Sequence, residues 1–152
     1  DIVSKNDALM LNVSPMASGH IPQNQQDILL EIGKWLDVNG EAIYGTRTWD
    51  VFGEGPAKLE KGGMFVDKVT YGARDVRYTR KGNTVYAIVL GWPGENVPVT
   101  FGSFAGKGKI KQVSVLGSTE KIAFTQDGIG LHIKTPSKKT DDKAFVVKVE
   151  LK

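Results

Sequence analysis

Apolar residues change their spacing once along the chain, from a helical period in the first third to a period of two in the rest. Residues 8–13 form a short apolar run, and a loop of serine, proline and glycine residues follows it. After Pro22, apolar residues recur at steps of three and four, which predicts an amphipathic helix. Its apolar stripe contains Ile28, Leu29, Ile32, Trp35 and Leu36. The Asn39-Gly40 pair is expected to end this helix with a left-handed residue.

From Met64 onward, apolar residues alternate with polar ones, which is typical of β-strands. Residues 85–90 are apolar on both faces, as expected of a central strand, and the preceding Lys81-Gly82-Asn83 predicts a hairpin turn. The predicted strands lie at residues 76–79, 85–90, 97–101, 110–116, 121–124, 129–134 and 145–151. Short strands at this spacing predict a mainly β fold, a two-sheet antiparallel sandwich.

The sequence divides into a β-loop-α unit over residues 1–48, a linker over 49–63 that is rich in glycine and lacks periodicity, and a sandwich domain over 64–152. A single β-loop-α unit cannot bury both faces of its strand, so the strand at residues 8–13 needs partners outside the unit. We expect this open strand to be displaced onto another surface, disordered, or paired with a second copy of the chain, because a free strand edge recruits partners.

Composition excludes several kinds of site. The chain has no cysteine, so it has no disulfide, thiolate metal site or thiol nucleophile, but the compartment stays open. The net charge of +3 comes from dispersed lysines, and no aromatic residue or arginine interleaves with Lys107, Lys109 and Lys111, so we expect no nucleic-acid partner. The apolar run at 85–90 is far shorter than the roughly 20 residues that a membrane span needs, so we expect a soluble chain with no membrane partner.

Four motifs carry a resemblance to a known family. They are DIVSKND, LMLNVSP, IPQNQQDILLEIGKWLDVNGEAIYGTRTW and DVRYTRKGNTVYAIVLGWP. Several motifs in one order are more specific than any single short motif. The chain resembles the C-terminal third of glycoside hydrolase family 29 α-L-fucosidases, most closely over residues 1–49 and then over 75–93.

The resemblance implies both a fold and an activity. The fold is the last β-loop-α unit of a truncated (β/α)8-like barrel, followed by the β-sandwich. The activity is the retaining, exo-acting hydrolysis of α-L-fucosides from glycans without a metal or another cofactor. The implied partners are a fucosylated glycan and the upstream barrel, and a secreted or periplasmic bacterial protein fits the family. A barrel alone takes roughly 250 residues, so most of it lies outside this chain. The alternative is a stand-alone carbohydrate-binding or structural β-sandwich module.

Retaining glycosidases need two carboxyl groups about 5 Å apart. In the family, both lie on or after earlier barrel strands, and no position in this chain matches either motif. We therefore assign no catalytic residue to the chain and expect the isolated chain to be inactive. His20 and His132 lie far apart in sequence, and no carboxylate stands at ligand spacing from them, so we expect no metal site.

Barrel active sites lie at the C-terminal ends of the strands, so the end of the 8–13 run and the loop after it would face the sugar. The candidate substrate-binding residues at this rim are Asn12, Ser14, Pro15 and Met16. The alternative is local: Asn12 satisfies backbone groups and Pro15 shapes the turn. Three aromatic residues could form a sugar-binding platform or seal an interface, and we favour the second role. They are Trp49, Trp92 and Phe104.

Overall fold

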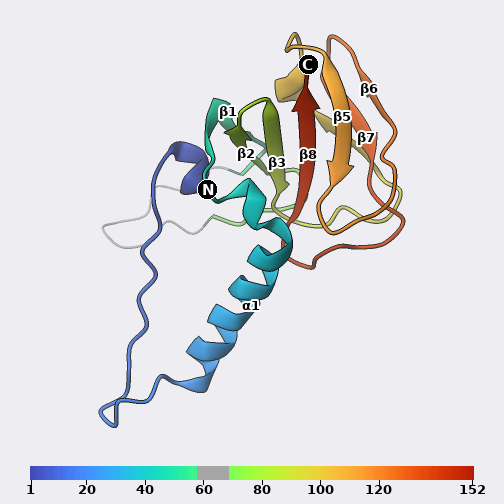
Figure 1. Cartoon of the computed structure of the whole chain (residues 1–152). Coiled ribbons are helices and arrows are strands. Elements are labelled where there is room, and N and C mark those ends of the chain that lie inside the picture. Colours follow the sequence, from blue (N-terminus) through green and yellow to red (C-terminus); the bar gives the residue numbers. More distant parts are fainter. Residues whose placement is uncertain (58–68) are drawn as a thin grey trace.

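The computed structural model describes residues 1–57 and 69–152, which form a two-sheet β-sandwich with one α-helix beside it (Figure 1). The helix is α1 (Gln23–Asn39), and short 3-10 turns are η1 (Val3–Lys5), η2 (Gly40–Ala42) and η3 (Gly102–Phe104). The strands are β1 (Arg47–Glu54), β2 (Val76–Lys81), β3 (Thr84–Val89), β4 (Pro98–Phe101), β5 (Ile110–Val115), β6 (Phe124–Gln126), β7 (Leu131–Lys134) and β8 (Phe145–Leu151).

The strands pair antiparallel in two sheets, with the order β1-β2-β3-β8-β5 in the larger sheet and β4-β7-β6 in the smaller. The predicted antiparallel sandwich is therefore confirmed. Strands β3 and β8 lie at the centre of the larger sheet, where Ala87 pairs with Val147. Neither α1 nor another helix in the described ranges is long and apolar enough to cross a membrane.

The larger sheet buries both of its faces around β3 and β8. One face carries Val85, Val147 and Val149 into the main core between the sheets. The other face carries Ile88 and Val146 into a smaller cluster. Partly buried side chains near the end of α1 pack against this cluster. The continuous apolar run of β3 follows from this position, because a strand covered on both faces has no solvent side to make polar.

Strand β1 lies where the sequence predicted a linker, so that prediction is wrong for residues 49–54. Thr48 pairs with Thr79, and the register with β2 then shifts by a bulge before Gly53. The bulge and the glycines break the alternation that would have revealed the strand. The predicted end of the linker at residue 63 lies within residues 58–68, outside the described residues.

The apolar run at residues 8–13 is not a strand, contrary to the prediction. It is an extended segment with exposed side chains, and Met10 is 84% exposed. No strand among the described residues pairs with it, so its backbone has no ladder to join. In Figure 1 this segment leaves the sandwich, turns back near residues 17–20, and α1 returns to the larger sheet with only its C-terminal end against the strands.

The end of α1 also differs from the prediction. Gly40 is right-handed, with φ −60° and ψ −25°, and the chain runs on into η2. The left-handed residue is Gly45, with φ +68°. A Cβ atom at position 40 would lie 3.1 Å from the ring of the exposed Tyr44, so a larger residue there would require that ring to shift.

Candidate functional site

The four predicted rim residues lie on the extended segment and the loop that leads into α1. All four are exposed to solvent. The backbone N–H of Ser14 donates to the side chain of Gln25 over 2.9 Å, and the N–H of Met16 donates to the carbonyl of His20 over 2.9 Å. The loop is thus tied to the first turn of α1, but the described residues bring no ionisable partner to the four side chains. Their role in binding sugar stays a prediction.

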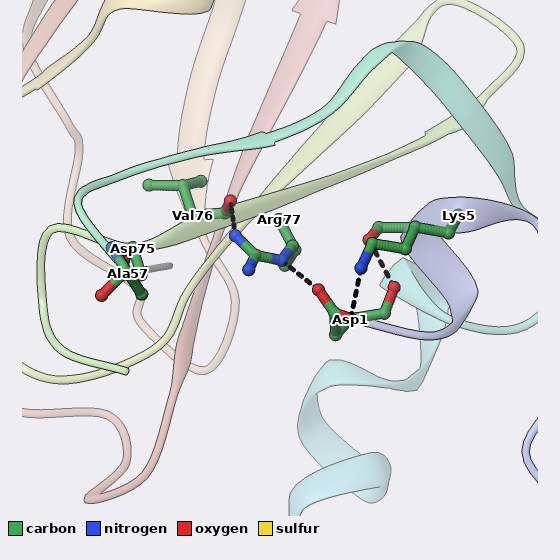
Figure 2. A network of polar contacts seen from close by, with 7 residues as sticks. Asp1, Lys5, Ala57, Asp75, Val76 and Arg77 are labelled. Atoms are coloured by element: carbon green, nitrogen blue, oxygen red, sulfur yellow. Dashed lines mark hydrogen bonds and ion pairs between the residues drawn. The ribbon is translucent and has the colours of Figure 1, made fainter. Parts of the chain in front are cut away.

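A polar junction joins the N-terminal segment to the sandwich (Figure 2). The Asp1 carboxylate accepts a hydrogen bond from Arg77 Nε at 2.5 Å and one from Lys5 Nζ at 2.8 Å. Arg77 also donates to the backbone carbonyl of Val76 at 2.9 Å. The Arg77 side chain is only 9% exposed, so its charge depends on the carboxylate opposite. The junction therefore links residues that are far apart in the sequence.

Two aromatic rings and a glycine lie next to the Arg77 side chain. Its guanidinium lies 5.6 Å from the centre of the Phe52 ring and 5.0 Å from that of the Tyr71 ring, within the range of cation–π attraction. A Cβ atom at Gly53 would lie 2.9 Å from Arg77 Cδ, so a larger residue there would displace the arginine. The neighbouring Asp75 carboxylate accepts the backbone N–H groups of Ala57 and Gly72, each at 2.8 Å. These contacts fix the loops on both sides of the junction.

An open groove of about 1000 Å³ lies between α1 and the larger sheet. Helix α1 contributes Ile28, Ile32 and Trp35, and the sheet contributes Ile88 and Leu90. Trp35 also donates its Nε1–H to the carbonyl of Ala144 at 2.8 Å, and both residues line the groove. Asp1 lies in the wall as well. The floor of the groove is apolar, and charged residues of α1 and of the loop before β8 surround it.

The carboxyl groups of the sandwich serve as acceptors for structural contacts. Glu54 accepts the backbone N–H groups of Gly102 and Ser103, and Glu120 accepts the N–H and hydroxyl of Ser137. The hydrogen bonds from Ser137 lower the pKa of Glu120. Hydrogen bonds from Lys107 and Lys139 likewise lower the pKa of Asp50 and of Asp142. A hydrogen bond with His132 lowers the pKa of Asp127. A glycosidase acid needs the opposite shift.

A hydrogen-bonded Thr-His-Asp cluster on the outer face of the smaller sheet was not among the predicted sites. His132 Nδ1 lies 3.0 Å from Thr100 Oγ1, and its Nε2 lies 2.9 Å from Asp127 Oδ1. The same Asp127 oxygen accepts the backbone N–H groups of Ile129 and Gly130. A carboxylate therefore contacts His132, and the Asp127-Gly128 turn was the available signal. The contacts brace a hairpin, and His20 lies on a different element. The described residues contain no group of three potential metal ligands.

The candidate platform aromatics pack inside the sandwich. The Trp49 ring lies 4.7 Å from Phe104 and 5.0 Å from Tyr78, measured between ring centres, and all three residues are buried. Trp92 is half-buried and meets Phe145 edge to face at 5.1 Å. The buried rings of Trp49 and Phe104 supply core contacts and cannot offer a flat face to a sugar, and Trp92 is partly covered by the core. A carbohydrate-binding module built on these aromatics therefore has no support.

Comparison with known families identifies the chain. The family model described as "Alpha-L-fucosidase C-terminal domain" matches residues 68–150, and the one described as "Alpha-L-fucosidase" matches residues 1–41. The chain belongs to the α-L-fucosidase family. The resemblance found in the sequence is thereby confirmed. The human tissue alpha-L-fucosidase is 39% identical over 140 residues, which cover 88% of the chain and 25% of that relative.

Solved structures of fucosidases share the fold. The α-fucosidase of Thermotoga maritima superposes with a TM-score of 0.73 at 32% identity, covering 97% of this chain and 31% of that one. Isoenzyme 1 of Paenibacillus thiaminolyticus superposes with a TM-score of 0.72 at 29% identity, covering 99% of this chain and 32% of that one. The chain therefore spans about a quarter of its human relative and a third of these bacterial fucosidases.

Proposed function

We propose that the chain is the C-terminal part of a longer retaining, exo-acting α-L-fucosidase that removes α-L-fucose from glycans. In this proposal the chain supports the catalytic barrel and carries neither catalytic carboxylate. The observation that carries the proposal is the match to two fucosidase family models over a chain that covers only a quarter of a human relative. The Thermotoga maritima enzyme has been solved in complex with fucose, which fits this substrate class.

The distribution of exposed apolar residues supports a missing partner. Eleven of the fifteen exposed large hydrophobic side chains among the described residues lie between Ile2 and Val38. They include Leu9, Met10 and Leu30. Apolar surface of this extent marks an interaction site. The sandwich, in contrast, buries a core of its own. We infer that the upstream barrel covers the N-terminal segment and the exposed face of α1.

The direction of the carboxyl pKa shifts supports the proposal that the catalytic pair lies outside this chain. The described carboxyl groups with a shifted pKa are shifted downward, so none of these is poised as an acid at neutral pH. On this proposal Asn12, Ser14, Pro15 and Met16 line the rim of the barrel, where they contact the sugar without taking part in proton transfer. Substitution of Asn12 by alanine in the longer protein is then expected to raise KM more than it lowers kcat.

Product stereochemistry in the longer protein tests the proposed function. The longer protein is incubated with 4-nitrophenyl α-L-fucoside, and the reaction is followed by proton NMR. We expect α-L-fucose to form first and to mutarotate afterwards, because retention passes through two displacements. First formation of the β-anomer, or no hydrolysis, contradicts the proposal. Saturable binding of free fucose by the isolated chain would favour a stand-alone carbohydrate-binding module instead.

A further inference from the structure

We propose that Arg77 is a positioning residue of the longer protein, which holds from the sandwich the start of the segment that carries the predicted rim residues. This inference rests on the proposed function, because the rim binds sugar only in that proposal. Arg77 acts on the rim through Asp1, which stands at the start of the same segment. The sandwich would thus contribute to sugar binding at a distance, through one ion pair.

Strands β1 and β2 and the loop before β2 fix the guanidinium of Arg77 in one orientation. Its Nη1 donates to the carbonyl of Val76 at 2.9 Å. The rings of Phe52 and Tyr71 lie beside it, and a Cβ atom at Gly53 would lie 2.9 Å from Nη1. The socket is therefore closely fitted to an arginine whose Nε–H points toward the N-terminal segment (Figure 2).

Asp1 is held by this donor and by the turn that follows it. Its carboxylate accepts hydrogen bonds from Arg77 Nε at 2.5 Å and from Lys5 Nζ at 2.8 Å. Its backbone carbonyl accepts the hydroxyl of the buried Ser4 at 2.6 Å. The turn η1 packs against β1 and β2, and the left-handed Asn6, with φ +70°, ends it. The direction in which the chain leaves the sandwich is therefore set within these few residues.

The segment between this turn and the rim acts as a lever. No strand among the described residues pairs with residues 8–13, and at the far end the N–H of Ser14 donates to the side chain of Gln25. An extended chain rises about 3.3 Å per residue, so Asn12 lies up to about 20 Å from Asn6. A rotation of about 10° at Asn6 would then move Asn12 by about 3 Å. Misplacement by about 1 Å is already costly in an active site, so the anchor decides how well the rim meets the sugar.

The burial of the ion pair favours a positioning role over a purely stabilising one. The side chain of Arg77 is 9% exposed and that of Asp1 is 29% exposed. Loss of hydration offsets much of the attraction in such a pair, so an apolar residue could stabilise the fold as well. A charged hydrogen bond with a fixed donor direction, in contrast, holds its partner in one place.

Steady-state kinetics of the longer protein with 4-nitrophenyl α-L-fucoside test the inference. Asp1→Asn keeps the shape of the side chain and removes its charge, and Arg77→Gln removes the charge of its partner. We expect each variant to raise KM about tenfold at nearly unchanged kcat, because saturating substrate draws the loosened segment back to the binding-competent position. The double variant should raise KM no further, because both changes remove one contact. Asp1→Asn decides the test alone if Arg77→Gln does not fold.

Asp50→Asn is the matched control for Asp1→Asn. Asp50 pairs with Lys107 at 2.7 Å, and both residues belong to the sandwich. The same chemical change there should leave KM and kcat as in the parent protein.

Hydrogen exchange of the longer protein gives a second readout that does not depend on activity. The amides of Lys5 and Asn6 donate to the carbonyls of Ile2 and Val3, each at 3.0 Å. In Asp1→Asn these amides should exchange about tenfold faster than in the parent, because the turn loses its contact with the sandwich. In the Asp50→Asn control they should exchange at the parent rate.

Three results in an active protein would overturn the inference and leave the proposed function standing. One is unchanged KM together with unchanged exchange of the turn. Another is unchanged KM with faster exchange, because the pair would then hold the turn without positioning the rim. The third is a fall in kcat at constant KM, which a merely structural role produces by lowering the folded fraction. A longer protein that hydrolyses no fucoside would contradict the proposed function and, with it, the role of the rim.

Discussion

Replacement of Trp35 by alanine should detach α1 from the sandwich without unfolding the sandwich. Trp35 packs against the cluster around Ile88 and Val146, and its Nε1–H donates to the carbonyl of Ala144 at 2.8 Å. Truncation of a fully buried tryptophan to alanine costs about 3 to 5 kcal/mol. Trp35 is only half-buried in this chain, so we expect about 2 to 3 kcal/mol, with about 1 kcal/mol of it from the hydrogen bond.

Hydrogen exchange of the 152-residue chain separates detachment of the helix from unfolding of the sandwich. A single helix of this length is marginal in water, so α1 should melt when it leaves the sheet. A loss of 2 to 3 kcal/mol raises the exchange of protected α1 amides by about 30- to 140-fold, since every 1.4 kcal/mol is a factor of ten. The amides of β3 and β8 should accelerate far less than those of α1, because the main core between the two sheets contains no residue of α1.

Leu30→Ala is the matched control for Trp35→Ala. Leu30 lies on the same helix and is 62% exposed, and alanine is the strongest helix former, so exchange of α1 should not rise. The reasoning is refuted if Trp35→Ala leaves the exchange of α1 unchanged. It is also refuted if the amides of β3 and β8 accelerate as much as those of α1, because the helix and sandwich would then unfold as one unit.

Three further substitutions test the packing of the sandwich. The Tyr78 hydroxyl is buried without a hydrogen-bond partner, so Tyr78→Phe should change the free energy of unfolding in urea by less than about 1 kcal/mol at neutral pH. Burial, together with the charge of Glu54, raises the pKa of Tyr78. The stability that the neutral Tyr78 contributes is therefore complete below the unfolded tyrosine pKa of about 10 and is lost as the pH rises above that value. Tyr78→Phe should flatten this alkaline decline of the free energy of unfolding in urea titrations. Gln126 donates to the carbonyls of Phe104, Lys107 and Gly108, so Gln126→Ala should cost about 1 to 3 kcal/mol in urea, while the exposed Gln112→Ala should cost little. Gly130 has φ +152°, and a Cβ there would lie 2.9 Å from the carbonyl carbon of Phe101, so Gly130→Ala should lower the melting temperature, whereas Gly128→Ala, in open space, should not.

The strands of the sandwich were predictable where side-chain alternation was intact. Strand β8 has the predicted bounds, and its inward residues Val147 and Val149 lie in the main core. Strand β6 begins at Phe124, where the predicted strand ended, because its pairing with β7 is set by the turn that Asp127 braces. Periodicity alone does not encode that tertiary constraint. The same limit explains why the bulged β1 was predicted as a linker.

The junction around Arg77 could not be predicted from the sequence. Arg77 alternates with apolar neighbours in β2, which predicts a solvent-facing side chain, yet it is nearly buried. Its partner Asp1 lies 76 positions away, and only the fold brings the two together. The strand predicted at residues 8–13 is wrong for the opposite reason. Its composition suits a strand, but strand formation needs neighbours that the described chain does not supply.

The most direct test of the central claim compares fucoside hydrolysis by two proteins. The purified 152-residue chain and the longer protein are each incubated with 4-nitrophenyl α-L-fucoside, and release of nitrophenol is measured at equal molar concentration. The account predicts turnover by the longer protein and none by the 152-residue chain, because it proposes that the catalytic carboxylate pair lies upstream. Nitrophenol release by the 152-residue chain, free of longer protein, would contradict the account.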